Sequence, residues 1–147
     1  MKIVVQRVLE ASVSVDDEVV GEINKGFFIL VGITQNDTVI DANILAEKIV
    51  KLRIISDSEG KMNLSLIDAN ESVLVVSQFT LFANTKKGNR PSFVDAADSS
   101  HAEKIYRYFV DKLVGYGINV KTGKFGEYMQ INTTLDGPVT IIIDTKQ

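Results

Sequence analysis

The sequence contains no cysteine and only one histidine, His101. Without cysteine, the chain can form no disulfide, offers no thiolate nucleophile and cannot bind zinc through sulfur. A single histidine excludes a multi-histidine metal site and leaves almost no room for a Ser-His-Asp triad. His101 falls in the first turn of a predicted helix, where we expect an exposed side chain without a catalytic role. We therefore expect no metal and no cofactor.

Long apolar runs are also missing from the sequence. No apolar run reaches the ~18 residues that a membrane-spanning helix needs. The first ten residues alternate in the manner of a strand and do not resemble a signal peptide. The sequence therefore predicts a cytoplasmic protein without a membrane partner.

An excess of positive charge is absent as well, because the net charge is −3. Broad, non-specific binding to nucleic acid depends on neutralising phosphates, so this charge argues against it. A local basic patch is still compatible with the composition. Lys86, Lys87 and Arg90 form one such cluster, in a loop that also contains glycine and proline. These charges either face solvent or contact a phosphate-bearing ligand.

The length and composition are those of one globular domain, residues 1–147. The 147 residues are 45% hydrophobic and 24% charged, which is ordinary for a protein with a core of its own. Periodic apolar residues predict two helices, one from a cap at 36–38 to about 55 and one from about 100 to 115–117. Apolar and alternating segments predict seven or eight short strands, at 2–15, 18–23, 26–33, 73–76, 118–120, 127–133 and 139–143. These elements predict an α+β fold with a mostly antiparallel, barrel-like sheet and two helices.

Polar side chains follow directly on one of the predicted core strands. Val73 to Val76 is a continuous apolar run, and Ser77, Gln78 and Thr80 come after it without a turn signal. An unpaired buried polar group costs about 1–3 kcal/mol, so these side chains need partners. They either bond to neighbouring backbone as the strand leaves the core or form a site. Because strand side chains alternate, we expect Gln78 and Thr80 on one face and Ser77 with Phe79 on the other.

A second stretch of interest is the segment Asp136-Gly137-Pro138-Val139-Thr140. The chain has only two prolines, and Gly-Pro at the entrance of a strand predicts a turn or a cis peptide. Near the start of the chain, Arg7 interrupts an apolar strand. Its side chain either lies on an exposed strand face or braces a site.

Together these residues resemble a known family. Ser77-Gln78-Phe79-Thr80 resembles the S-Q-x-T motif of the D-aminoacyl-tRNA deacylase (D-tyrosyl-tRNA deacylase) family, and Gly137-Pro138-Val139-Thr140 resembles the second half of its N-x-G-P-x-T motif. The resemblance covers essentially the whole chain and includes segments 6–8, 26–32, 61–63, 87–93 and 122–126. Two residues depart from the family pattern. Leu135 replaces an asparagine and Glu127 replaces a small residue, and we expect these changes to affect rate and substrate range.

The resemblance implies an activity, a substrate and a dimer. It implies hydrolysis of the ester that joins a D-amino acid, and also glycine mischarged on alanine tRNA, to the 3′-ribose of tRNA. It further implies a homodimer in which Gly137-Pro138, as a cis peptide, enters the partner's pocket. Backbone carbonyls of that loop would hold the substrate ammonium, so that an L side chain collides with the loop and a D side chain points to solvent.

The resemblance also assigns roles to side chains. Ser77, Gln78, Phe79 and Thr80 would form the catalytic site, with backbone N–H groups around Phe79 and Thr80 and the Gln78 amide stabilising the oxyanion. Water attack assisted by the ribose hydroxyl is the preferred chemistry, and Thr80 as a nucleophile is the alternative.

Other residues would support this site and bind the tRNA. Phe79 and Met129 either stack on the terminal adenosine or belong to the core. Arg7 would brace the Gly-Pro loop, and Thr140 is a further supporting residue. Lys86, Lys87 and Arg90 would contact acceptor-stem phosphates. Competing interpretations are an editing domain for L-amino acids and a non-catalytic tRNA-binding dimer with an impaired site.

Overall fold

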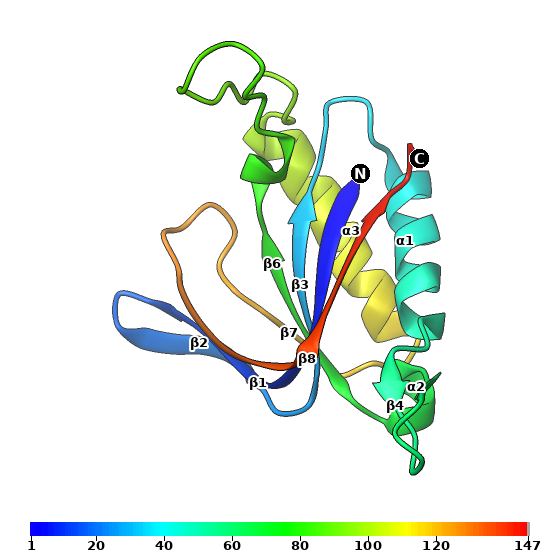
Figure 1. Cartoon of the computed structure of the whole chain (residues 1–147). Coiled ribbons are helices and arrows are strands. Elements are labelled where there is room, and N and C mark those ends of the chain that lie inside the picture. The colour runs from blue at the N-terminus through cyan, green and yellow to red at the C-terminus, as the bar shows by residue number, and fades with distance from the viewer. Residues whose placement is uncertain (147) are drawn as a thin grey trace.

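A strongly curved sheet forms the body of the molecule in the computed structural model, which describes residues 1–146 (Figure 1). The strands are β1 (Lys2–Val15), β2 (Glu18–Ile23), β3 (Gly26–Gly32), β4 (Ile55–Ser56), β5 (Met62–Leu64), β6 (Ser72–Ser77), β7 (Val120–Thr122) and β8 (Gln130–Asp144). The helices are α1 (Val39–Lys51), α2 (Leu66–Ala69) and α3 (Ser99–Gly115), with a 3₁₀ helix η1 (Phe79–Phe82). Because β2 also packs against β7, the curved sheet is nearly closed into a barrel. The fold is one α+β domain with three helices, one more than the sequence predicted.

The sheet is mixed, whereas a mostly antiparallel sheet was expected. Its strand order is β2-β1-β3-β6-β7, and β8 pairs with the other edge of β1. All three pairings of β1 are antiparallel, but β3–β6 and β6–β7 are parallel. Parallel neighbours need a crossover connection that is usually helical. Here α1 lies between β3 and β6 along the chain, and α3 lies between β6 and β7.

Helices α1 and α3 cover one face of the sheet and create the larger core. The buried residues of that face include Phe27, Ile29, Leu45, Ile49, Val75, Phe109 and Leu113. Tyr106 of α3 donates a hydrogen bond from its hydroxyl to the Val75 carbonyl at 2.9 Å, and burial raises the pKa of this phenol. A second cluster, which includes Val8, Val13, Phe28 and Leu74, fills the opposite, concave side. The strands between these two clusters are therefore apolar on both faces, as the continuous apolar runs indicated.

Two helix ends lie where the sequence predicted them, the Thr38 cap of α1 and the end of α3 at Gly115, and the other two differ. Helix α1 begins after Thr38, whose side chain accepts from the backbone of Ile40, and it ends at Lys51 because the chain then enters β4. Helix α3 is capped by Asp98, which accepts from the backbone N–H of His101 at 3.0 Å, so it begins one residue earlier than expected. Helix α2 is a single turn, too short to leave a periodic signal.

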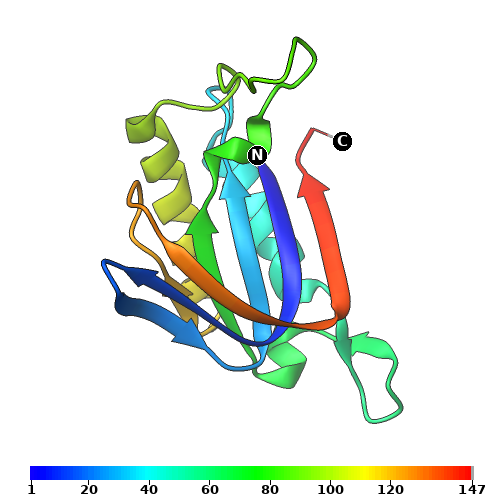
Figure 2. The same ribbon diagram turned by 60° about the vertical axis from the view of Figure 1, so that its left-hand side comes forward.

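The C-terminal part of the chain also differs from the prediction. The two strands expected at 127–133 and 139–143 are one strand, β8, which passes through a cis Gly137-Pro138 peptide. The pairing of β8 with β1 is irregular there, with register shifts on both sides of Val8. Figure 2 shows β8 beside β1, with its outer edge unpaired within residues 1–146. Across residues 1–146, no helix is long and apolar enough to cross a membrane.

Candidate active site

The S-Q-F-T residues lie where β6 leaves the sheet. Ser77 is the last residue of β6, and the chain turns at Gln78 into the 3₁₀ helix η1. The expectation that Gln78 and Thr80 share one face of a strand is therefore wrong. Gly32 on β3 leaves space beside this turn, since a Cβ there would lie 3.0 Å from the Cβ of Leu81. The Gln78 amide nitrogen nevertheless donates to the Thr80 hydroxyl, so these two side chains are still neighbours.

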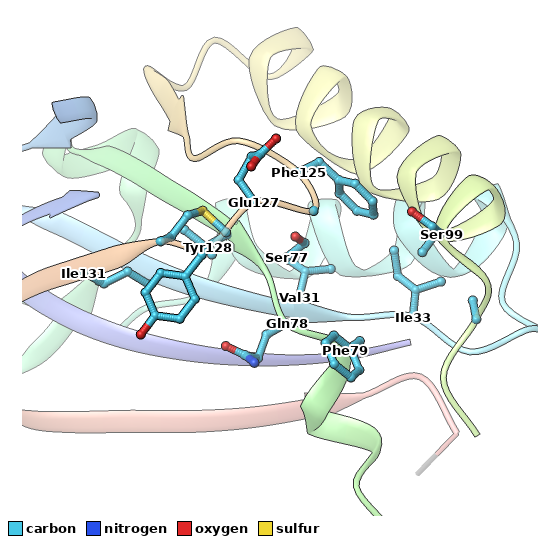
Figure 3. A pocket seen from close by; sticks show the side chains of 15 residues that line it. Val31, Ile33, Ser77, Gln78, Phe79, Ser99, Phe125, Glu127, Tyr128 and Ile131 are labelled. Carbon is cyan, nitrogen blue, oxygen red and sulfur yellow. The ribbon is translucent and has the colours of Figure 1, made fainter. Parts of the chain in front are cut away.

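A pocket of about 550 Å³ opens beside these residues. Its apolar wall comes from β3, β6 and the start of α3, and its other side comes from the segment before β8. The lining residues that the sequence predicted are Ser77, Gln78, Phe79, Glu127 and Met129, and those that it missed include Ile33, Ser99, Phe125, Tyr128 and Ile131. Figure 3 shows Ser77 and Gln78 between Tyr128 on one side and Phe79 with Ile33 on the other. A mostly apolar pocket with a few polar groups is typical of a small-molecule site.

Charge is nearly absent from this pocket. Glu127 is the single charged residue among those that line it. Within residues 1–146, no group of three or more His, Cys, Asp or Glu side chains lies close enough to hold a metal ion. His101 is half-buried and not exposed as predicted, because its Nε2 lies 2.8 Å from the Asp37 carbonyl oxygen. It does not line the pocket.

The basic cluster lies on a loop beyond η1. The backbone N–H of Asn84 donates to the Ser92 carbonyl at 2.8 Å, and the reverse bond is 2.9 Å long. Lys86, Lys87 and Arg90 are all exposed on the segment that these two bonds close. In Figure 1 this loop projects away from the body of the molecule, above η1.

The Gly-Pro segment lies away from the pocket of its own chain. Neither Gly137 nor Pro138 lines the pocket. The segment is instead held from behind by Arg7, which is only 9% exposed. The Arg7 Nε lies 3.0 Å from the Asp136 carboxylate and 3.2 Å from its carbonyl oxygen, and Nη1 donates to the Ile54 carbonyl at 2.7 Å. Arg7 therefore fastens the Gly-Pro segment to the chain that follows α1.

Further charges surround this contact. A cavity of about 100 Å³ behind the segment is lined by Arg7, Lys25, Glu71 and Asp136, among others. Burial raises the pKa of Glu71; the positive charges of Lys25 and Arg7 oppose this rise, and the negative charge of Asp136 adds to it. The remaining supporting residue, Thr140, is exposed on β8 and accepts a 3.4 Å hydrogen bond from the Gln6 side chain.

The structure thus divides the predicted residues into two groups. Ser77, Gln78, Phe79 and Met129 meet at the pocket, and Thr80 adjoins it through Gln78. Arg7, Gly137 and Pro138 form a second group at a different place on the same chain. The aromatic residues that sequence reasoning missed come from segments whose position depends on the tertiary fold.

Comparison with solved structures shows that this fold occurs in other proteins. A solved structure of a probable eukaryotic D-amino acid tRNA deacylase has the same fold, with a TM-score of 0.84 and 16% identity over 97% of both chains. A c-Myc DNA unwinding element binding protein superposes with a TM-score of 0.92 and shares 40% identity over 99% of both chains. The first likeness concerns the fold alone, and the second extends to the sequence.

Comparison of sequences then identifies the family. D-aminoacyl-tRNA deacylases of Fervidobacterium nodosum and Bacillus cereus are each 49% identical to this chain. The first alignment covers 100% of this chain and 99% of the relative, and the second covers 99% and 100%. The family model for D-Tyr-tRNA(Tyr) deacylase matches residues 4–144. The chain belongs to this family.

Proposed function

We propose that this protein is a D-aminoacyl-tRNA deacylase, which hydrolyses the ester between a D-amino acid and the 3′-ribose of tRNA. The observation that carries the proposal is the placement of Ser77, Gln78 and Phe79 on the wall of the apolar pocket, in a chain that matches deacylases over its full length. Because the substrate is aminoacylated tRNA, we place the activity in the cytoplasm. The experiment that tests the proposal is hydrolysis of matched D- and L-aminoacyl-tRNA.

The pocket is suited to the terminal adenosine of the tRNA. Its apolar walls can accept a base and ribose, and Phe79 and Met129 are among the residues that line it. The ester carbonyl would then lie at Gln78, near the start of η1. Backbone N–H groups around Phe79 and Thr80, with the Gln78 amide, would stabilise the charge that develops on that oxygen. An aminoacyl ester is already activated, so positioning and this stabilisation carry the reaction.

We assign the attack to a water molecule activated by the free hydroxyl of the terminal ribose, and a positioning role to Thr80. Thr80→Ala removes the hydroxyl that accepts from Gln78 and leaves the backbone N–H in place. We expect kcat/KM for D-Tyr-tRNA to stay within about tenfold of the wild-type value, because only one hydrogen bond to the amide is lost. Single-turnover hydrolysis measures this.

The matched substrate control is a tRNA that ends in 2′-deoxyadenosine, with D-tyrosine on the 3′ oxygen. The wild-type enzyme should lose more activity on this substrate than the Thr80→Ala variant loses on normal tRNA. Background activity of a folded Thr80→Ala protein, together with full activity on the deoxy substrate, would instead make Thr80 the nucleophile.

We further propose a homodimer in which each Gly137-Pro138 segment completes the partner's pocket. Strand β8 supports this arrangement, because it is 15 residues long and its outer edge is unpaired within residues 1–146. Ile131, Leu135 and Ile142 on this strand are 37%, 42% and 62% exposed. A long free edge with exposed apolar side chains is a surface that another chain would cover. Ile131 also lines the pocket, so a partner on β8 would lie next to it.

The dimer explains how one pocket can select D-amino acids. Backbone carbonyls of the partner's Gly137-Pro138 would bind the substrate ammonium while η1 binds the ester. With both groups fixed, an L side chain meets loop backbone and a D side chain points outward. Glycine has no side chain to exclude, so glycine mischarged on alanine tRNA is a further proposed substrate. Glu127 at the pocket and Leu135 on β8 are expected to tune the rate and substrate range.

The exposed basic loop is the proposed contact for acceptor-stem phosphates. Replacing Lys86, Lys87 and Arg90 together by alanine should weaken tRNA binding at physiological salt by about tenfold or more. The slope of log affinity against log salt concentration should decrease in magnitude by about 2–3 units, because each phosphate contact contributes nearly one unit of slope. Fluorescence anisotropy with uncharged tRNA over a salt series measures both quantities.

A matched variant carries the same change in charge at another place. Lys48, Lys51 and Lys61 lie on and after α1, do not line the pocket and can be replaced by alanine together. This variant should keep the wild-type salt dependence within half a unit of slope. An equal loss of tRNA affinity in the two triple variants would show that tRNA binding depends on net charge alone, and it would contradict a specific contact with the basic loop.

A non-catalytic tRNA-binding dimer is the competing function. It predicts salt-dependent binding of tRNA without hydrolysis of any ester. An editing domain for L-amino acids predicts the reverse stereochemical preference. Both are separated from the proposed function by the same assay on D- and L-aminoacyl-tRNA.

A further inference from the structure

An exposed pair of aromatic rings extends the pocket outward. Phe79 and Phe93 pack edge to face, with ring centroids 5.1 Å apart and an interplanar angle of 75°. Their side chains are 57% and 36% exposed, and the next residue, Val94, is 83% exposed. Edge-to-face contact is a preferred arrangement of two aromatic rings, so Phe79 holds the Phe93 ring in position. Phe79 also lines the pocket and therefore lies between the pocket and Phe93.

The basic loop ends directly before Phe93, one member of this aromatic pair. The two backbone hydrogen bonds between Asn84 and Ser92 end the loop one residue before Phe93. Residues 85–91 carry three cationic side chains and no acidic one. Within residues 1–146, none of these three cations forms a salt bridge. The loop that carries these unpaired positive charges therefore joins the chain directly before Phe93.

We propose that Phe93, held by Phe79, stacks against the nucleotide that precedes the terminal adenosine, while the basic loop binds the phosphates that follow toward the 5′ side. This inference rests on the proposed function. The 3′ end of a tRNA is single-stranded, and single strands are bound by aromatic stacking beside a positively charged surface. With adenosine in the pocket, a strand that leaves past Phe79 meets Phe93 next.

Charge also fixes the side on which the strand leaves. The opposite rim of the pocket is formed by Tyr128, which is 88% exposed, and by Glu127. The Glu127 carboxylate repels phosphate, whereas the rim at Phe79 leads to three cations. Phe93 is therefore a positioning residue for the tRNA end and does not touch the reacting atoms.

The test compares two esters of D-tyrosine, one on adenosine alone and one on the trinucleotide CCA. Phe93→Leu keeps an apolar side chain and removes the aromatic face. It should raise KM for the trinucleotide ester about tenfold, the size expected for the loss of one stacked base. The kcat on this ester, and KM for the adenosine ester, should change less than twofold. Phe93→Tyr should restore the wild-type KM.

Tyr116→Leu is the matched control, because Tyr116 is an exposed aromatic residue after α3 that does not line the pocket. It should leave both esters unaffected. An equal effect of Phe93→Leu on the two esters would show that Phe93 merely supports the pocket, and no effect on either would show that no base stacks there. Both results overturn the inference.

A binding measurement separates this inference from the proposed function. If the wild-type protein hydrolyses neither of these esters nor D-Tyr-tRNA, the proposed function fails. Binding of uncharged, fluorescently labelled CCA trinucleotide then still tests the stacking. Wild-type protein should bind it about tenfold more tightly than the Phe93→Leu variant, and equal affinities would overturn the inference.

Discussion

Gly137→Ala is expected to lower the hydrolysis of D-Tyr-tRNA by about a hundredfold. Gly137 has a φ of +131°, which side-chain-bearing residues rarely adopt. A Cβ at this position would lie 2.9 Å from both the backbone nitrogen and a methyl carbon of Val139. The segment would have to shift, and a displacement of about 1 Å in a group that positions substrate can reduce the rate a hundredfold. Single-turnover kinetics on D-Tyr-tRNA measures the effect.

The same variant should weaken chiral selection, because we propose that backbone carbonyls at this segment both hold the ammonium and exclude L side chains. The matched control is Gly115→Ala at the end of α3, where an added Cβ would meet no atom within 4 Å outside the backbone of its own helix. This control should retain wild-type kinetics and selectivity. Normal D-ester hydrolysis by a folded Gly137→Ala protein would contradict the assignment of Gly137 to the site.

Arg7→Met should lower both the stability of the protein and its activity. The substitution keeps a long apolar side chain but removes the Nη1 bond to the Ile54 carbonyl and the contacts to Asp136. The contact to the Ile54 carbonyl is buried, so its loss should reduce the free energy of unfolding by about 2 kcal/mol. The contact to the Asp136 carboxylate, which is 42% exposed, adds little. Urea unfolding measures the change.

The loss of activity should exceed what reduced stability explains. Without Arg7, the Gly-Pro segment is no longer fastened, and we expect D-Tyr-tRNA hydrolysis to fall about a hundredfold at temperatures where the variant is fully folded. Arg7→Lys keeps the charge but cannot reach all partners of the guanidinium, so it should recover only part of the activity.

The control variant is Arg107→Met, which makes the same substitution at an exposed arginine. Arg107 is exposed on α3 and pairs with Glu103 four residues earlier, so neither stability nor activity should change measurably. If Arg7→Met destabilises the protein but leaves the rate on D-Tyr-tRNA unchanged, Arg7 has a structural role alone and does not brace the site.

The sequence predicted the features that depend on local patterns. Continuous apolar runs marked β3 and β6 correctly as strands buried on both faces. Two of the polar residues that follow Val76, Ser77 and Gln78, line the pocket, and their catalytic role stays a prediction. Because the chain has only two prolines, the sequence pointed to Gly137-Pro138 as a turn or a cis peptide, and this peptide bond is cis. The family resemblance is confirmed by the full-length match to known deacylases.

Features that depend on distant contacts were not predictable in this way. The turn into η1 after Ser77 carries no local signal, because the glycine that makes room for it is Gly32 on β3. The parallel pairing of β3 with β6 follows from the crossover through α1, which the prediction of a mostly antiparallel sheet did not consider. Tyr128 and Phe125 reach the pocket only because the segment before β8 folds back over β6. The homodimer and the individual catalytic roles stay predictions.

The central claim is that the pocket, completed by a partner's Gly-Pro segment, hydrolyses esters of D-amino acids and spares those of L-amino acids. The most direct measurement is a paired deacylation assay with D-Tyr-tRNA, L-Tyr-tRNA and Gly-tRNA, using the purified protein after its oligomeric state has been measured by light scattering. We predict rapid release of D-tyrosine and of glycine, with L-Tyr-tRNA decaying at the rate of the enzyme-free control. Equal release of D- and L-tyrosine, or no release of either by a folded dimer, would contradict this account.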